Sequence, residues 1–152
     1  MVNESYNFSY PIEILFGFIA GFLGTMIFHQ LVLALLWAVG FAPLKPFSMD
    51  STQPLGVPSV ISLSFWGGVW GIIYVLIHTK FSLLGNYWLI SFLFGAILPS
   101  LVALLLVFPL KGRPIMGGWD PKLLLIVFII NGAWGIGTGF FIKALSAMYG
   151  KS

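Results

Sequence analysis

The sequence predicts an all-α integral membrane protein, a helical bundle with four transmembrane helices in a single membrane domain over residues 1–152. Three observations carry this prediction: 59% of the residues are hydrophobic, only 7% are charged, and long stretches carry no charge at all. Soluble domains have about 25% charged residues. The few charged side chains of this chain cannot cover the surface of a soluble domain of 152 residues. The absence of cysteine excludes a small secreted module held by disulfides.

The positions of the charges define the spans. No charged residue lies between Glu13 and Lys45, Asp50 and Lys80, Lys80 and Lys111, or Lys122 and Lys143. Crossing the hydrocarbon core takes about 20 helical residues, and each stretch is long enough. We predict helices over residues 12–41, 58–79, 86–109 and 121–146. Helices are favoured over a barrel because no alternation of polar and apolar residues is present.

Local signals mark where each helix begins. Pro11 fits the opening turn of the first helix, and Pro58 fits that of the second. Asn86 is placed to cap the third helix. Asp120 precedes Pro121, which is a capping carboxylate followed by a proline at the first helical position. These signals agree with the spans that the charges define.

Short matches recur in the same order in the two halves, which predicts a tandem duplication of two-helix units over residues 12–79 and 86–146. The matched segments are Phe22-Leu23 with Phe92-Leu93, Pro43-Leu44-Lys45 with Pro109-Leu110-Lys111, and Gly68-Val69-Trp70-Gly71-Ile72 with Gly132-Ala133-Trp134-Gly135-Ile136. Both units enter the membrane in the same direction. The prediction is therefore a parallel 2+2 repeat about an axis along the membrane normal.

Small residues recur at helical spacing on three of the predicted helices. These glycines are Gly17, Gly21, Gly24, Gly67, Gly71, Gly132, Gly135 and Gly139. Small residues let helix backbones approach closely in lipid. We expect the stripes to pack the helices within the bundle. The alternative is a dimerisation face or a contact with a larger complex, for which Gly17 and Gly21 are the best candidates.

Uncharged polar residues inside the spans define a candidate site near the membrane midplane. His29 and Gln30 lie in the first span and Asn131 in the fourth, and such side chains normally face protein or a water-filled cavity. Pro99 frees a backbone carbonyl in the third span. The repeat matches Pro99 with His29, so His29, Gln30, Pro99 and Asn131 are predicted to meet at the repeat interface. The alternative is a structural histidine bonded to a neighbouring helix.

The residue types that carry chemistry do not form a catalytic or cofactor pattern. His78, the other histidine, lies at the end of the second helix, so a haem held by two histidines does not fit. The carboxylates Glu13, Asp50 and Asp120 lie near span boundaries, which leaves no set of metal ligands. A catalytic triad, paired carboxylates and a phosphate-binding loop are also missing. We predict that the protein is not an enzyme and has no cofactor.

The loops joining the first two and the last two spans hold basic and aromatic residues, which we expect to contact lipid head groups: Lys45, Lys111, Arg113, Trp119 and Lys122. Ordinary interfacial anchoring is the alternative. Aromatic residues near the opposite surface, among them Tyr74 and Tyr87, fit an interfacial belt. These two loops carry four basic residues against three on the opposite side, which favours the cytoplasmic side for the loops. A net charge of +3 spread over both surfaces excludes nucleic-acid binding.

Four segments together resemble a group of short four-helix proteins of the bacterial inner membrane that has no known activity. The segments are His29-Gln30, Leu55-Gly56-Val57-Pro58, Trp66-Gly67-Gly68-Val69-Trp70-Gly71 and Asn131-Gly132-Ala133-Trp134-Gly135. The resemblance covers nearly the whole chain and implies a location in the bacterial inner (cytoplasmic) membrane.

These features favour a non-enzymatic membrane protein with lipid and protein partners. We expect an accessory or assembly subunit that packs against other membrane helices or self-associates. The alternative is a small homo-oligomeric transporter or channel, with a polar pathway at His29 and Asn131.

Overall fold

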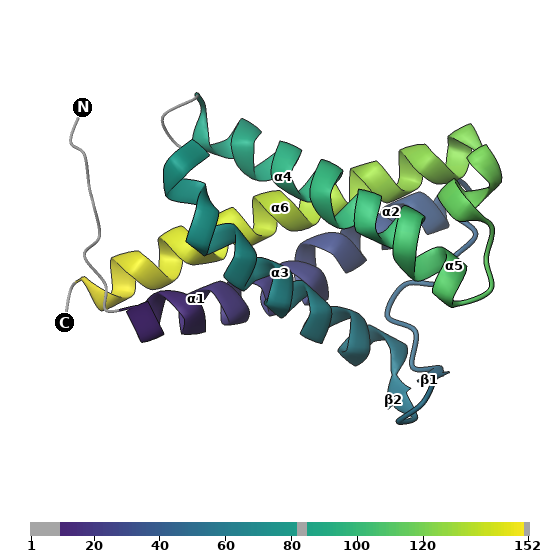
Figure 1. Ribbon diagram of the computed structural model, residues 1–152, viewed down its shortest axis with the longest axis horizontal. Coiled ribbons are helices and arrows are strands. Elements are labelled where there is room, and N and C mark those ends of the chain that lie inside the picture. Colours follow the sequence, from purple (N-terminus) through teal and green to yellow (C-terminus); the bar gives the residue numbers. More distant parts are fainter. Residues whose placement is uncertain (1–9, 82–84, 151–152) are drawn as a thin grey trace.

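The computed structural model describes residues 10–81 and 85–150. Four of its helices are long and apolar enough to cross a membrane: Tyr10–Ala38, Ser59–His78, Tyr87–Leu110 and Pro121–Tyr149. They run alternately in opposite directions along the long axis of the molecule (Figure 1). The prediction of an all-α chain with four helices that can span a membrane is confirmed. Two loops, the one after the first span and the one before the fourth span, lie at the same end of the bundle. We call this end the loop face.

The first span consists of three consecutive helical segments: α1 (Tyr10–Leu23), the π-helical η1 (Gly24–His29) and α2 (Gln30–Ala38). It ends before the predicted position 41 because Gly40 adopts a φ of +72°. The amides of Phe41 and Ala42 then turn back and donate to the carbonyl of Leu36 at 2.8 and 3.0 Å. This left-handed glycine turn satisfies carbonyl groups that a helix end otherwise leaves without partners.

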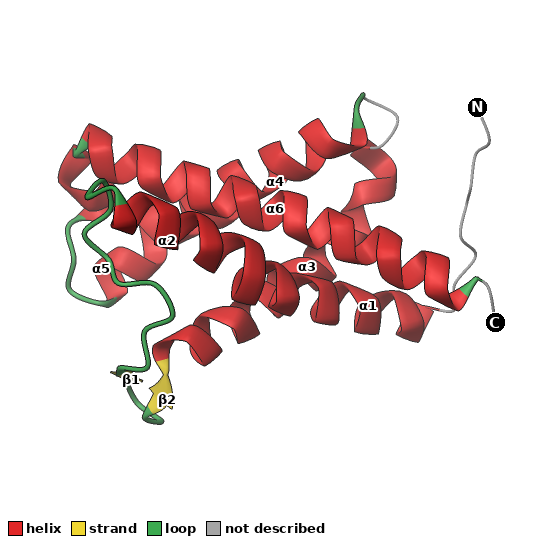
Figure 2. Cartoon of the chain, turned by 180° about the vertical axis from the view of Figure 1, so that it is seen from behind, coloured by secondary structure: helices red, strands yellow, loops and turns green. Residues whose placement is uncertain are grey.

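Loop 1, residues 39–58, is an ordered part of the structure. It contains a two-stranded antiparallel hairpin, β1 (Ser51–Thr52) with β2 (Val57–Pro58). The amides of Ser59 and Val60 donate to the carbonyls of Asp50 and Ser48 at 2.8 and 2.9 Å, so the loop caps the next helix. Between α2 and the hairpin the chain dips back toward the middle of the bundle, as both ribbon views show (Figures 1 and 2).

The second and third spans are α3 (Ser59–Phe81), and α4 (Tyr87–Val102) with the π-helical η3 (Ala103–Val107) and α5 (Phe108–Leu110). Asn86 caps α4 as predicted, since its side-chain oxygen accepts from the amides of Trp88 and Leu89 at 2.9 and 3.3 Å. Pro99 lies inside α4 without ending it, and the π-helical turn follows within a few residues.

The fourth span, α6 (Pro121–Tyr149), begins as the sequence predicts. The Asp120 carboxylate accepts from the amide of Lys122 at 3.0 Å, with Pro121 at the first position. The preceding turn, η4 (Ile115–Trp119), has positive φ angles from Met116 through Trp119. The pair Gly117-Gly118 allows this turn, because glycine adopts left-handed angles without a steric penalty.

Helix α6 occupies the centre of the packing. It contacts α1 and η1 on one side and α4 on the other, while α3 packs mainly against α1. Helices α3 and α4 meet near the buried Tyr74 and diverge toward the loop face (Figure 1). The core therefore has two parts along the bundle axis.

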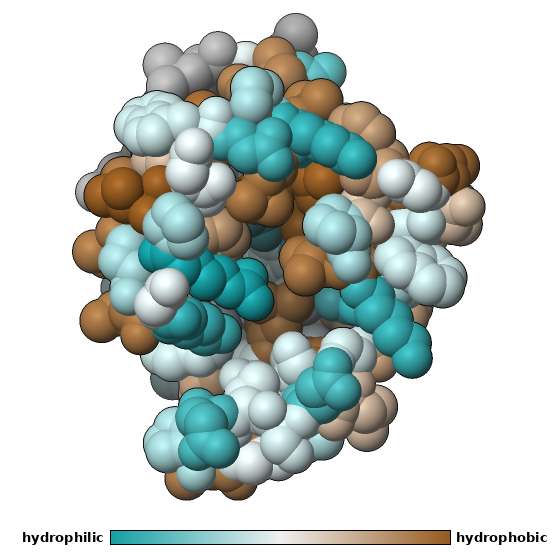
Figure 3. All heavy atoms as spheres, turned by 90° about the vertical axis from the view of Figure 1, so that its right-hand side faces the viewer, coloured by the Kyte–Doolittle hydropathy of each residue, from teal (hydrophilic) through white to brown (hydrophobic). Residues whose placement is uncertain are grey.

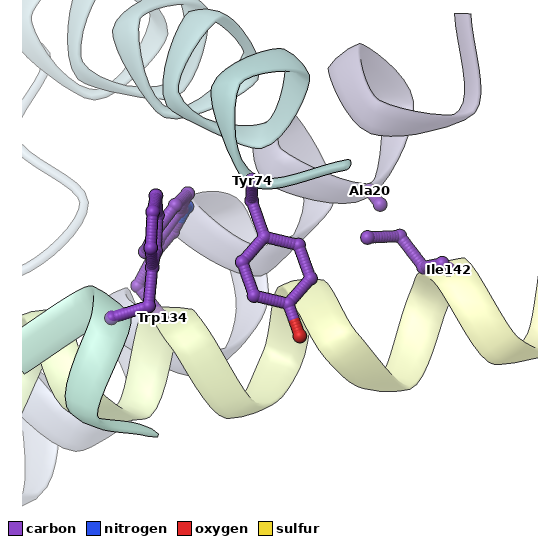
Figure 4. Packing of buried hydrophobic residues seen from close by; sticks show 5 residues of the cluster. Ala20, Tyr74, Trp134 and Ile142 are labelled. Carbon is purple, nitrogen blue, oxygen red and sulfur yellow. The ribbon is translucent and has the colours of Figure 1, made fainter. Parts of the chain in front are cut away.

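The part further from the loop face is a cluster of buried side chains, Ala20, Tyr74, Phe94, Trp134 and Ile142. Figure 4 shows Tyr74 reaching from α3 toward α6, with Trp134 on one side and Ala20 and Ile142 on the other. The rings of Tyr74 and Phe94 meet edge to face with centroids 5.1 Å apart. The second part, nearer the loop face, consists of Leu33, Ala42, Ile126 and Ile130.

Glycines bring α1 and α3 into backbone contact. A Cβ atom at Gly21 would overlap the carbonyl of Gly67, and one at Gly71 would overlap the carbonyl of Gly17. The stripe at Gly17 and Gly21 is therefore covered by α3 and does not face outward as a docking surface. Gly24, one turn further, lies against Thr138 of α6.

Helices α4 and α6 meet in the same manner. A Cβ atom at Gly95 would overlap the carbonyl of Asn131, and one at Gly135 would overlap the carbonyl of Ser91. The remaining glycines predicted to pack helices, Gly132 and Gly139, lie against Phe92 and against Ser91 with Tyr87, respectively. Close backbone approach thus joins α1 to α3 and α4 to α6.

Candidate functional site

The four residues predicted to meet at the midplane lie in the interior but form two separate groups. His29, Gln30 and Pro99 are buried, and Asn131 is half-buried. Within the described residues, no hydrogen bond joins His29 or Gln30 to Asn131.

The first group ties loop 1 to the first span. The side-chain oxygen of Gln30 accepts a hydrogen bond from the amide of Phe47 at 2.6 Å, and its Nε2 lies 3.4 Å from Nδ1 of His29. Phe47 has a φ of +50°, which is uncommon for a residue with a side chain. Gln30 therefore satisfies a backbone group of the dipping loop and holds it in an unusual conformation.

The second group ties α4 to α6 next to the proline. Asn131 donates from Nδ2 to the hydroxyl of Ser100 at 3.0 Å, and Ser100 donates to the carbonyl of Val127 at 3.4 Å. Ser100 follows Pro99 directly, so these bonds secure α4 where the proline removes a backbone donor. The arrangement stabilises a helix contact.

The carbonyl of Gly21 is a third polar contact point. It accepts from the hydroxyl of Thr25 at 3.2 Å and from the indole Nε1 of Trp134 at 2.9 Å. The Trp134 bond spans from α6 to α1 at the point where α1 touches α3. A buried indole N–H requires such a partner, so the bond fixes the relative position of three helices.

A polar cluster near the other end of the bundle was not predicted. Tyr74 donates to Ser91 at 2.6 Å, because the Ser91 hydroxyl itself donates to the carbonyl of Tyr87 at 2.8 Å. The hydroxyl of Tyr87 donates to the carbonyl of Gly139 at 2.8 Å, and Nζ of Lys143 lies 4.2 Å from the Tyr87 ring centroid. These contacts join α3, α4 and α6.

The interfacial-belt interpretation was wrong for Tyr74, which is 1% exposed. Hydropathy does not distinguish a tyrosine at the membrane surface from one that inserts its ring into the core, because both positions lie near a helix end. The signal in the sequence was the spacing of Tyr87 and Ser91, which places them one turn apart on α4.

We expect Tyr74→Phe to lower the free energy of unfolding by about 1 kcal/mol, because the ring packing stays while one buried hydrogen bond is lost. Thermal unfolding in detergent measures this loss. Tyr10→Phe is the matched control, since Tyr10 is 67% exposed. Equal melting temperatures for the two variants would contradict a stabilising role of the Tyr74 bond.

The basic and aromatic residues predicted to contact lipid, Lys45, Lys111, Arg113, Trp119 and Lys122, are all exposed and belong to the loop face. Hydrophilic residues gather around a hollow in this face (Figure 3). Two of the cations lie over aromatic rings: Arg113 is 5.4 Å from the centroid of Phe108, and Nζ of Lys122 is 5.1 Å from that of Phe41. The rings restrict where these charges can lie.

The fold and these contacts define a helical bundle with four helices long and apolar enough to cross a membrane, in which the side-chain amides of Gln30 and Asn131 are hydrogen-bonded within the chain. In the part of the chain that the structure describes, no three His, Asp or Glu side chains come together as possible metal ligands. Comparison with models of protein families, with characterised proteins and with solved structures finds no match to this chain.

Proposed function

We propose that the chain is a non-enzymatic accessory or assembly subunit that packs against other membrane proteins with its loop face. The observation that carries this proposal is the exposure of large apolar side chains on ordered loops or at the ends of spans. Leu55, Leu110 and Trp119 are 84%, 85% and 66% exposed. Apolar side chains exposed in this way are stabilised when a partner covers them and removes them from water.

The order of the loops supports the same function. Gln30 holds Phe47, the carbonyls of Ser48 and Asp50 hold the start of α3, and Asp120 caps α6. A surface that is already in its bound shape loses less conformational entropy when a partner docks. The loop face is therefore suited to recognising another protein.

The interior supports a subunit over a transporter. A pathway at His29 and Asn131 would need their polar groups free for a solute. Instead, the neighbouring Gln30 is bonded to loop 1 and Asn131 is bonded to Ser100. Opening a pathway would break the bonds that hold the loop and α4 in place.

Photo-crosslinking tests the proposal. With a photoreactive amino acid at position 55 or 110, we expect a defined band of higher mass that contains another protein subunit. The control position is Leu35 on α2, which is 67% exposed and lies within a span. We expect the complex to co-migrate with the chain on native gels after mild detergent. Crosslinks from positions 55 and 110 to lipid alone, as from position 35, would contradict a protein partner.

We also propose that the two helix pairs are a tandem 2+2 repeat with parallel units. The support is the correspondence of contacts between pairs. Gly21 lies against the carbonyl of Gly67 as Gly95 lies against that of Asn131. Gly68 of α3 lies against a phenylalanine ring of α1, and Gly132 of α6 lies against a phenylalanine ring of α4.

The contacts suggest a different register for the repeat from the one the sequence matches favour. Gly68 meets the ring of Phe18 and Gly132 meets that of Phe92, so Phe18 corresponds to Phe92. The sequence match pairs Phe22 with Phe92, one helical turn away. Leucine-rich segments can be aligned one helical turn apart with the same hydropathy, so their match does not fix the register. A glycine packed against an aromatic ring does fix it, because a shift of one turn would remove the contact. In this register Thr25, rather than His29, corresponds to Pro99.

We propose the bacterial inner membrane as the location, with loops 1 and 3 in the cytoplasm. The resemblance of the sequence to short inner-membrane proteins supports the location. The orientation is supported by the exposed Lys45, Lys111, Arg113 and Lys122 of the loop face, because basic residues near span ends favour the cytoplasmic side.

A further inference from the structure

A pocket of about 300 Å³ lies between the end of the first span and the start of the fourth. Gly40, Phe41 and Pro43 line one wall, and Asp120, Lys122 and Ile126 line the other. The two spans that flank it end at Ala38 and begin at Pro121. The pocket therefore lies at the level where phospholipid head groups meet the hydrocarbon core.

The pocket presents one negative and one positive charge. Oδ1 of Asp120 accepts from the amide of Lys122, which leaves the second carboxylate oxygen available. The Lys122 ammonium lies over the ring of Phe41, which belongs to the opposite wall. Among the described residues neither charge has an ion-pair partner. The site can thus accept a cationic and an anionic group at the same time.

The inner part of the pocket is apolar. Leu123 is half-buried and Ile126 is almost fully buried, and both belong to the first turns of α6. A ligand that fits the whole pocket has two opposite charges close together and an apolar portion directed toward the membrane. A purely anionic head group would place its phosphate beside Lys122. The Asp120 carboxylate would then have no cationic partner and would be repelled by the negative charge of the head group.

We propose that this pocket binds the head group of a zwitterionic phospholipid that carries a primary ammonium group. The phosphate pairs with Lys122 and the ammonium pairs with Asp120, while the first carbons of an acyl chain contact Leu123 and Ile126. A primary ammonium group can donate hydrogen bonds to the Asp120 carboxylate, whereas a quaternary ammonium group cannot. The site does not depend on a protein partner of the loop face.

Native mass spectrometry of the full-length protein in detergent, with equal amounts of phosphatidylethanolamine and phosphatidylglycerol added, tests this site. We expect wild-type protein to retain more phosphatidylethanolamine. Asp120→Asn keeps the helix cap, because asparagine and aspartate cap equally well. This variant is expected to lose about two- to fivefold in phosphatidylethanolamine binding, the range for one exposed ion pair. Lys122→Gln should weaken the binding of both lipids.

Lys111→Gln is the matched control, since Lys111 is an exposed cation of the same face that does not line the pocket. We expect it to leave the lipid preference unchanged. Soluble glycerophosphoethanolamine at the same concentration should displace little lipid, because it lacks the apolar portion. The proposal is overturned if wild type prefers phosphatidylglycerol, if Asp120→Asn keeps the preference, or if the soluble head group competes equally.

Discussion

Gly21→Ile is expected to separate α1 from α3 and to lower the free energy of unfolding by about 3 kcal/mol or more, the upper range for overpacking. A side chain at this position would meet the carbonyl of Gly67 and the Cα of Gly71. Backbone atoms cannot rotate away as a side chain can. Moving α1 outward would also stretch the hydrogen bond from Trp134 to the Gly21 carbonyl.

Unfolding in detergent, followed by tryptophan fluorescence or circular dichroism, measures the effect of Gly21→Ile. Lys45→Ala is the control, because Lys45 is exposed on loop 1 and removing its charge changes no helix contact. Trp134 is buried and donates to the Gly21 carbonyl, so its fluorescence reports on the contact that the substitution changes. If the two variants unfold at the same detergent concentration or temperature, the close approach of α1 and α3 is not a major source of stability.

Gln30→Leu is expected to release loop 1. The leucine has nearly the same size, so the packing of α2 remains, but the amide of Phe47 loses its acceptor. This bond is partly buried, so leaving the donor without its acceptor costs about 1 kcal/mol, the low end of the range for buried groups. Phe47 has a left-handed backbone conformation, which is strained for a residue with a side chain. Relief of this strain also favours rearrangement of the loop once the bond is absent.

Hydrogen exchange distinguishes this local effect from a general loss of stability. In Gln30→Leu we expect the amide of Phe47 and its neighbours in loop 1 to exchange faster, while the amides of α6 stay protected. Leu31→Ala provides the comparison, since Leu31 is the next residue and is exposed on the outside of the helix. Unchanged exchange at Phe47 in the Gln30 variant would show that other contacts hold the loop.

The helices were predictable because the requirement for them is local. A backbone in lipid must satisfy its own hydrogen bonds, so an uncharged apolar stretch of sufficient length forms a helix whatever its neighbours are. Caps are also local: Asn86 and Asp120 bond to amides two or three residues away, and both were recognised in the sequence. The end of the first helix was less accurate, because the turn at Gly40 depends on backbone angles that hydropathy does not report.

The candidate site was predictable only in part. The sequence identified His29, Gln30, Pro99 and Asn131 as polar or unusual residues inside the spans. It paired them with one another, whereas Gln30 bonds to loop 1 and Asn131 bonds to Ser100. The cost of a buried polar group predicts that a partner exists, but it does not identify the partner.

The sequence alone determined the spans and the scarcity of charge inside them, because length and hydropathy act residue by residue along the chain. Only the tertiary structure decided which groups meet: Gly21 with Gly67, Gln30 with Phe47, and Tyr74 with Ser91. These contacts join residues distant in the chain, and their energies depend on the rotation and register of whole helices. In lipid many registers bury similar apolar surface, so close glycine contacts and a few hydrogen bonds select one.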